Sequence, residues 1–220
     1  MKQYVAKLFN ALEKNTDLRE AFYSTLDSMP ARIPLHEFLM ELYKPMKNDH
    51  RYLEIIDLAI EREPEYFDLY SLKASELAKE NPRAAIETLS RGLYVLYNKD
   101  DEDKDITWCY LRIAELLGKL GEHKESIHAC NLALDTKFDP ELIDFFYRVS
   151  YNLRAEQYLK TGQKNNAKKD LERVLQYSKD DIDIINKIRE IDGYEPISDP
   201  TKMQNDFLNA DSSTAGQSKS

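Results

Sequence analysis

The stretch YLRIAELLGKLGEHKESIHACNLAL, residues 110–134, is followed by a second stretch of the same design, YNLRAEQYLKTGQKNNAKKDLERVL, residues 151–175. At an offset of 41 residues, both place an aromatic, a small and a bulky residue before a glycine, and further small and bulky residues after it. Apolar residues within each stretch recur three and four apart, the spacing of one buried helix face. Each stretch therefore predicts two helices joined by a short turn at Gly121 or Gly162.

Small residues stand where the two helices of each pair would cross. Helices approach closely only where small side chains face each other, so we expect Ala114 to pack against Ser126, and Ala155 against Ala167. Between the two stretches, the remaining corresponding positions, each 41 residues apart, are Tyr110 and Tyr151, Leu117 and Tyr158, Cys130 and Leu171, Ala133 and Val174, and Leu134 and Leu175.

Helical periodicity continues through almost the whole chain, without strand-like alternation. The 220 residues are 42% hydrophobic and include only 6 Gly and 8 Pro, which argues against a turn-rich all-β fold. The pattern predicts helices at residues 2–14, 17–28, 34–45, 49–61, 66–79, 82–97, 104–119, 122–136, 140–160, 163–178 and 180–190. Their short connections predict antiparallel hairpins.

The repeated hairpin resembles the tetratricopeptide repeat, a helix-turn-helix of about 34 residues. Two weaker copies run from Leu39 to Pro64 and from Tyr70 to Leu93. The resemblance implies an all-α fold, a right-handed superhelical solenoid of antiparallel helix hairpins, because each hairpin buries its faces only when stacked.

Three regions follow from this interpretation. Residues 33–192 form the repeat domain, residues 1–32 form an N-terminal hairpin that can be a degenerate repeat, and residues 193–220 have the composition of a disordered tail. A capping helix at 180–190 closes the array, with an apolar stripe of Ile182, Ile185 and Ile188 that can extend to Ile191.

Composition and charge exclude several classes of protein. The net charge of −9 and pI near 5.1 disfavour nucleic acid or an anionic membrane surface as partner. No stretch reaches the roughly 18 uncharged apolar residues of a membrane helix, and the first ten residues lack the apolar core of a signal peptide. Cys109 and Cys130 lie in apolar-periodic segments without a CxxC partner, as in a reducing compartment. We expect a cytoplasmic protein.

No pattern indicates a catalytic, cofactor-binding or metal site. Gly118-Lys119 matches the end of a phosphate-binding loop, but the first glycine of that motif is missing. His123 and His128 are five apart, so one helix presents them on different sides, and we expect an exposed turn histidine at 123 and a partly exposed helix histidine at 128. We therefore predict that the protein is not an enzyme.

The resemblance implies a binding groove lined by the first helix of each hairpin. Constant offsets from the bulky residues of these helices select the candidate positions. These are Glu37, Ser71, Leu111 and Asn152, then Glu41, Ser75, Glu115 and Glu156, then Lys79, Lys119 and Lys160. Trp108, at the start of a first helix, is a candidate aromatic anchor.

The charges of these positions bear on the partner. The glutamates favour a basic or mixed-charge peptide or helix of another protein. Alternatively, Glu115 with Lys119 and Glu156 with Lys160 are four-apart pairs that stabilise their own helices. Glu37 and Glu41 stand where the resemblance would require Lys and Asn for binding the acidic C-terminal tails of heat-shock chaperones, so we do not expect that use.

The function predicted from these features is a non-catalytic protein–protein interaction module, an adaptor or scaffold. One alternative is a dedicated chaperone for a client protein, which would suit a small acidic repeat protein. An alternative of another class is a regulatory subunit or an enzyme whose residues form no known pattern.

Overall fold

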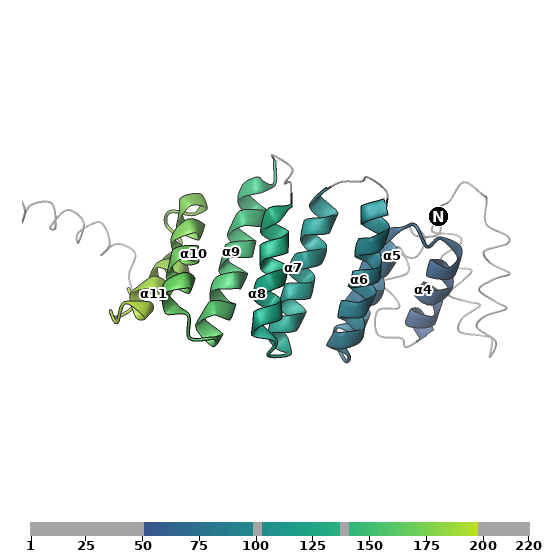
Figure 1. Cartoon of the computed structure of the whole chain (residues 1–220), viewed down its shortest axis with the longest axis horizontal. Helices are drawn as coiled ribbons and strands as arrows, with labels where there is room; N and C mark the ends of the chain where they lie inside the picture. The colour runs from purple at the N-terminus through teal and green to yellow at the C-terminus, as the bar shows by residue number, and fades with distance from the viewer. Residues whose placement is uncertain (1–50, 99–102, 137–140, 198–220) are drawn as a thin grey trace, which may run out of the picture. The chain divides into compact units, whose positions relative to one another are not determined.

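The computed structural model of the chain describes residues 51–98, 103–136 and 141–197, and all regular secondary structure in these ranges is α-helical (Figure 1). The helices are α4 (Arg51–Arg62), α5 (Phe67–Leu77), α6 (Pro82–Asn98), α7 (Asp103–Lys119), α8 (His123–Asp135), α9 (Ile143–Lys160), α10 (Lys164–Tyr177) and α11 (Ile182–Ile191). The all-α class is confirmed, and the bounds agree with the predicted ones within three residues. The helices expected at 2–14, 17–28 and 34–45 lie outside the described residues.

The chain divides into two compact units, residues 1–109 and 110–220, so that α7 contributes to both. In the first unit, α5 packs against both α4 and α6. Gly92 allows the close approach of α5 and α6, because a Cβ atom at this position would lie 3.0 Å from Phe67 and from Cβ of Tyr70. The Cys109 thiol donates to the carbonyl of Leu89 at 3.3 Å and holds the start of α7 against α6.

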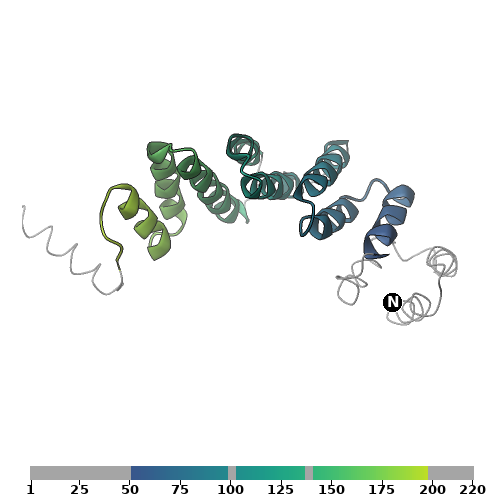
Figure 2. The same cartoon turned by 90° about the horizontal axis from the view of Figure 1, so that it is seen from below.

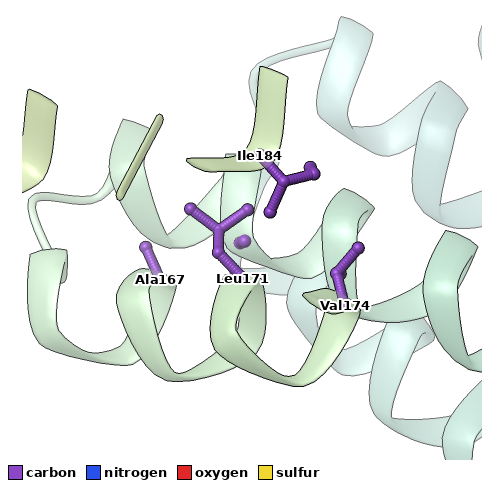
Figure 3. Packing of buried hydrophobic residues seen from close by; sticks show 5 residues of the cluster. Ala167, Leu171, Val174 and Ile184 are labelled. Carbon is purple, nitrogen blue, oxygen red and sulfur yellow. The ribbon is translucent and has the colours of Figure 1, made fainter. Parts of the chain in front are cut away.

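The second unit contains the two hairpins that the sequence repeats. The Ser126 hydroxyl donates to the Ala114 carbonyl at 2.6 Å, and both residues are fully buried, as the small side chains predicted. In both views of the chain α10 lies beside α9 and α11 (Figures 1 and 2). Their shared core cluster consists of Ala155, Ala167, Leu171, Val174 and Ile184 (Figure 3).

The predicted glycine turns are confirmed in detail. Gly121 and Gly162 have φ of +79° and +76°, a left-handed conformation that costs glycine little. After Gly121 the next N–H donates back to the carbonyl of Leu117 at 2.9 Å, and after Gly162 the next N–H donates to Tyr158 at 2.8 Å. Gly193, with φ of +82°, ends α11 in the same way. Both predicted hairpins therefore turn by the same backbone geometry.

Two expectations at the C-terminal end need correction. The predicted isoleucine stripe is only partly correct. Ile188 and Ile191 pack against the core cluster, but the buried isoleucine of α11 is Ile184, which the prediction omitted. The reason is that the contact with α9 and α10 selects the face of α11, and an isoleucine-rich helix offers more than one apolar stripe.

Residues 193–197, which composition assigned to the tail, lie against α11. The Asn186 side chain both donates to the Ile197 carbonyl at 3.1 Å and accepts from the Ile197 N–H at 2.7 Å. Nε of Arg189 donates to the Glu195 carbonyl at 2.8 Å, and its guanidinium lies over the Tyr194 ring. We call residues 194–197 the strap. The expected N-terminal hairpin at 1–32 and the remainder of the tail, 198–220, lie outside the described residues.

Candidate functional site

The predicted surface residues follow each first helix at intervals of four, the spacing of one helix side. We call Ser71, Ser75 and Lys79 the α5 row, Leu111, Glu115 and Lys119 the α7 row, and Asn152, Glu156 and Lys160 the α9 row. The α5 row belongs to the first unit, and the α7 and α9 rows belong to the second. Glu37 and Glu41, the corresponding candidates further upstream, lie outside the described residues.

The α5 row is engaged with its own helix. The Ser75 hydroxyl donates to the Ser71 carbonyl at 2.9 Å, and Nζ of Lys79 donates to Glu76 at 2.5 Å. Trp108, the candidate anchor in the same unit, is 42% exposed. An exposed indole that also makes contacts within the chain can serve as a partly preorganised anchor.

The α7 row carries a compensated carboxylate. Glu115 accepts from Arg112 at 2.5 Å and from Lys119 at 2.7 Å. Partial burial raises the pKa of Glu115, but the hydrogen bond from Lys119 and the charge of Arg112 outweigh it, so the pKa lies below its ordinary value. The four-apart pair of Glu115 and Lys119, which was one of two interpretations, is thus confirmed.

Leu111 does not belong to a binding surface, and its assignment is wrong. It is 2% exposed and forms a buried cluster with Ala133 and Phe146. Phe146, which packs with Leu111 in this cluster, comes from the N-terminal part of α9 in the next hairpin. Leu111 is therefore buried, although Asn152, the residue at the corresponding position of the next hairpin, is partly exposed.

The α9 row binds a residue that sequence reasoning did not select. Nζ of Lys187, on α11, lies 3.1 Å from Oε1 of Glu156 and 3.2 Å from Oδ1 of Asn152. The cation paired with Glu156 is therefore Lys187, where the sequence suggested Lys160. Lys187 is 31 residues away from Glu156, beyond the reach of any local pattern.

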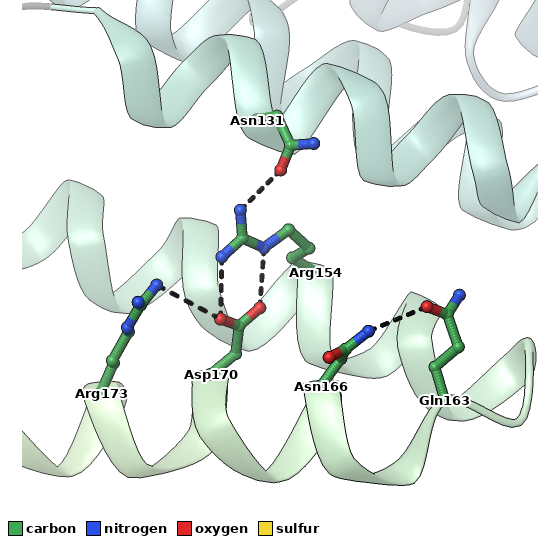
Figure 4. Close-up of polar contacts among 6 residues, drawn as sticks. All are labelled: Asn131, Arg154, Gln163, Asn166, Asp170 and Arg173. Carbon is green, nitrogen blue, oxygen red and sulfur yellow. Dashed lines mark hydrogen bonds and ion pairs between the residues drawn. The ribbon is translucent and has the colours of Figure 1, made fainter.

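A polar cluster between the rows and the core was also missed. Arg154 donates twice to Asp170, through Nε at 2.7 Å and a terminal nitrogen at 2.8 Å, and once to Asn131 at 2.5 Å (Figure 4). Its guanidinium also lies over the rings of Tyr151 and Tyr158, at 5.4 and 5.8 Å. The cluster joins α8, α9 and α10 and so fixes the orientation of the helix that carries the α9 row.

The pKa of Arg154 reflects this arrangement. Burial lowers the pKa of Arg154, but the hydrogen bonds and charge of Asp170 raise it by more than burial lowers it. The pKa therefore lies above its ordinary value, and the guanidinium stays charged. The repeat contained a signal for this pair. At the offset of 41 residues Ile113 corresponds to Arg154 and Ala129 to Asp170, so two buried apolar positions become oppositely charged together.

A second polar contact joins the two hairpins of the second unit. His123 is half-buried, contrary to the exposed position expected for it, and its Nδ1 lies 2.9 Å from Oε1 of Gln157. A Cβ atom on Gly118 would lie 2.9 Å from the same glutamine side chain. Gly118 thus allows α7 and α9 to approach each other, which gives a packing reason for this glycine.

Within the described ranges, no group of three or more His, Cys, Asp and Glu residues is arranged to hold a metal ion. In the same ranges no helix has the length and apolar character needed to cross a membrane. Cys109 and Cys130 are buried free thiols, and burial raises the pKa of Cys130 to about 12. A thiol with so high a pKa is a poor nucleophile.

The fold and the rows on its first helices define a class of protein, the helical repeat proteins built from stacked hairpins. A sequence profile of the tetratricopeptide repeat matches residues 109–140 and 149–181, which contain the two hairpins of the second unit. These two hairpins are thus similar to tetratricopeptide repeats in sequence. No curated protein sequence matches the chain.

Solved structures of similar fold support the class. MamA from Desulfovibrio magneticus RS-1 has 10% sequence identity and a TM-score of 0.57, over 86% of this chain and 100% of that one. Pseudomonas aeruginosa PilF has 14% identity and a TM-score of 0.54, over 71% of this chain and 67% of that one. A signal transduction ATPase with a tetratricopeptide repeat sensor, from Pyrococcus horikoshii, has 17% identity and a TM-score of 0.54, over 85% of this chain and 32% of that one. At these identities the likeness concerns the fold alone.

Proposed function

We propose that the protein is a non-catalytic interaction module that binds a segment of another protein along the first helices of its hairpins. Tetratricopeptide repeats generally act as protein-binding scaffolds, since stacked hairpins present a long, preorganised surface. The observation that carries the proposal is the accessibility of the α9 row. Asn152 and Glu156 remain partly exposed and hold an ammonium group, while the core beside them is complete without them.

The charge of the rows supports a mixed-charge segment as partner. Glu115 and Glu156 are already bound to cations of the chain, so an incoming Lys or Arg must compete with them. The ammonium groups of Lys119 and Lys160 are exposed and can donate hydrogen bonds to an acidic group of the partner. A peptide or helix that carries both signs satisfies both kinds of residue. Two buried free thiols are compatible with a cytoplasmic location, which we propose for this interaction.

Affinity purification of the full chain followed by mass spectrometry tests the proposal. A chain carrying Glu115→Lys and Glu156→Lys should lose partners that the unaltered chain retains. The matched control carries Glu125→Lys and Glu172→Lys, which make the same charge change at exposed positions on the second helices α8 and α10. An identical set of partners for all three proteins would refute the assigned surface.

The identity of the retained partner, followed by assays on the purified chain, separates the alternatives. A chaperone would retain one unfolded client and suppress its aggregation in a light-scattering assay. A regulatory subunit would retain an enzyme and change its rate. Turnover of a small molecule by the purified chain alone would contradict the non-catalytic assignment.

A further inference from the structure

The contact between α11 and α9 has the composition of a small ligand site. Nζ of Lys187 has two acceptors from α9, an amide oxygen of Asn152 at 3.2 Å and a carboxylate oxygen of Glu156 at 3.1 Å. A primary ammonium has three hydrogen-bond donors and no acceptor. A neutral amide oxygen beside a carboxylate can accept two of these hydrogen bonds and balance the single positive charge. The α9 row therefore contains an acceptor pair that already binds one lysine side chain.

This acceptor pair is local to α9. The equivalent positions on α7 are Leu111, which is buried, and Glu115, which is bound by Arg112 and Lys119. The equivalent positions on α5 are Ser71 and Ser75, which carry no charge. Among the three rows, a neutral amide and a carboxylate face one ammonium group only on α9.

The bound lysine is exchangeable. The side chain of Lys187 is 36% exposed and that of Glu156 is 45% exposed, so water screens their attraction. The helix that carries Lys187 is held independently, by Ile184 in the core and by the strap on Asn186. Lys187 can therefore leave by rotation of its side chain while α11 stays in place.

We propose that Asn152 and Glu156 form a binding site for a lysine side chain of the partner, and that Lys187 occupies this site until the partner displaces it. The inference rests on the proposed function and extends it by naming the group recognised. Because Lys187 competes for the site, it lowers the affinity of the protein for segments that contact it through a single basic group alone. A segment with a lysine at this point and further contacts along the rows replaces it.

Amine footprinting of the full chain tests the occupancy of the site without any partner. Trace acetylation with mass-spectrometric readout gives a relative rate for each lysine. We expect Lys187 to react more slowly than the exposed Lys169 of α10, and Glu156→Gln to accelerate Lys187 by about two- to fivefold, the range of an exposed ion pair. Lys169 should not change. A rate for Lys187 that Glu156→Gln leaves unchanged would overturn the proposal.

Displacement is tested with a fluorescent hexalysine peptide and anisotropy titration. Lys187→Met should bind the peptide about two- to fivefold more tightly than Lys169→Met, which removes the same charge at a distant position. Glu156→Gln should bind it more weakly than the unaltered chain. Equal affinities of the two Met variants would overturn displacement by Lys187 and leave the proposed function standing. Absence of binding by every variant would overturn both this inference and the preference for a basic group.

Discussion

The guanidinium of Arg154 forms two parallel hydrogen bonds with the carboxylate of Asp170, at 2.7 and 2.8 Å, in the interior of the second unit. The two side chains are only 12% and 4% exposed. Asn131 accepts a third hydrogen bond from the same guanidinium at 2.5 Å. A buried pair of this kind has its charges desolvated, so each partner depends on the other.

Removal of one partner should be more damaging than removal of both. Asp170→Ala leaves a buried cation without its counterion, and we expect a loss of about 3–5 kcal/mol in the free energy of unfolding. The double variant Arg154→Ile with Asp170→Ala recreates Ile113 and Ala129 of the preceding hairpin and should recover most of that loss. Urea denaturation of the two single variants and the double variant measures the coupling. Additive losses would show that the pair is not coupled.

The left-handed glycines should resist substitution for a purely local reason. A Cβ atom on Gly121 or Gly162 would have no other atom within 4 Å, so Ala at either position adds backbone strain without a clash. Each substitution should cost about 1–2 kcal/mol. Asn, which tolerates this conformation better, should cost less. Thermal denaturation checks the order Gly, Asn, Ala, with exposed Asn165→Ala as a control, and Ala equal to Gly would contradict the role of φ.

The strap should loosen when Asn186 loses its amide. Asn186→Ala removes both hydrogen bonds to Ile197, and since one hydrogen bond contributes about 1 kcal/mol, we expect the Ile197 amide to exchange its hydrogen roughly fivefold faster. Asn186→Asp keeps the acceptor for this N–H and should change the rate less. Hydrogen exchange read by NMR measures both rates. Equal rates in all three proteins would show that Asn186 does not hold the strap.

The thiol of Cys130 should respond to pH differently in the folded and unfolded chain. Its pKa is raised from 9.0 to about 12 by burial, so the folded state keeps the proton over this interval while the unfolded state loses it. The contribution of this group to stability is therefore present below pH 9 and is lost as pH rises toward 12.

Iodoacetamide labelling followed by peptide mass spectrometry checks this expectation. In the folded chain the labelling rate of Cys130 should still increase above pH 9, whereas in urea it should level off near its ordinary pKa. The peptide of Cys109, the other buried thiol, is read in the same digest as an internal comparison. A plateau near pH 9 in the folded chain would contradict the raised pKa.

Local patterns were sufficient for the helices, the hairpins and their turns. The periodicity of apolar residues predicted every described helix, because burial of one face imposes the same spacing wherever a helix packs. Gly121 and Gly162 marked the turns because few other residues adopt positive φ. Ala114 and Ser126 marked a helix crossing because only small side chains permit it.

Contacts between distant residues could not be obtained in this way. A constant sequence offset places Leu111 on the surface, but packing between the hairpins buries it against Ala133 and Phe146. Glu156 was paired with Lys160 by proximity in sequence, and folding places Lys187 beside it instead. The charged pair Arg154 and Asp170 left a trace in the repeat, since both positions change together, but the meaning of that change required their separation in space.

The amino-acid pattern alone thus specified an all-α chain with two tetratricopeptide-like hairpins, because helix periodicity, glycine turns and small residues at crossings act over a few residues. The partners of the charged side chains were specified only by the packing of α9, α10 and α11. Charges interact through space, and the same row of Glu and Lys residues can bind its own helix, a neighbouring helix or another protein. For Asn152 and Glu156 the packed structure brings Lys187 of α11 within hydrogen-bonding distance.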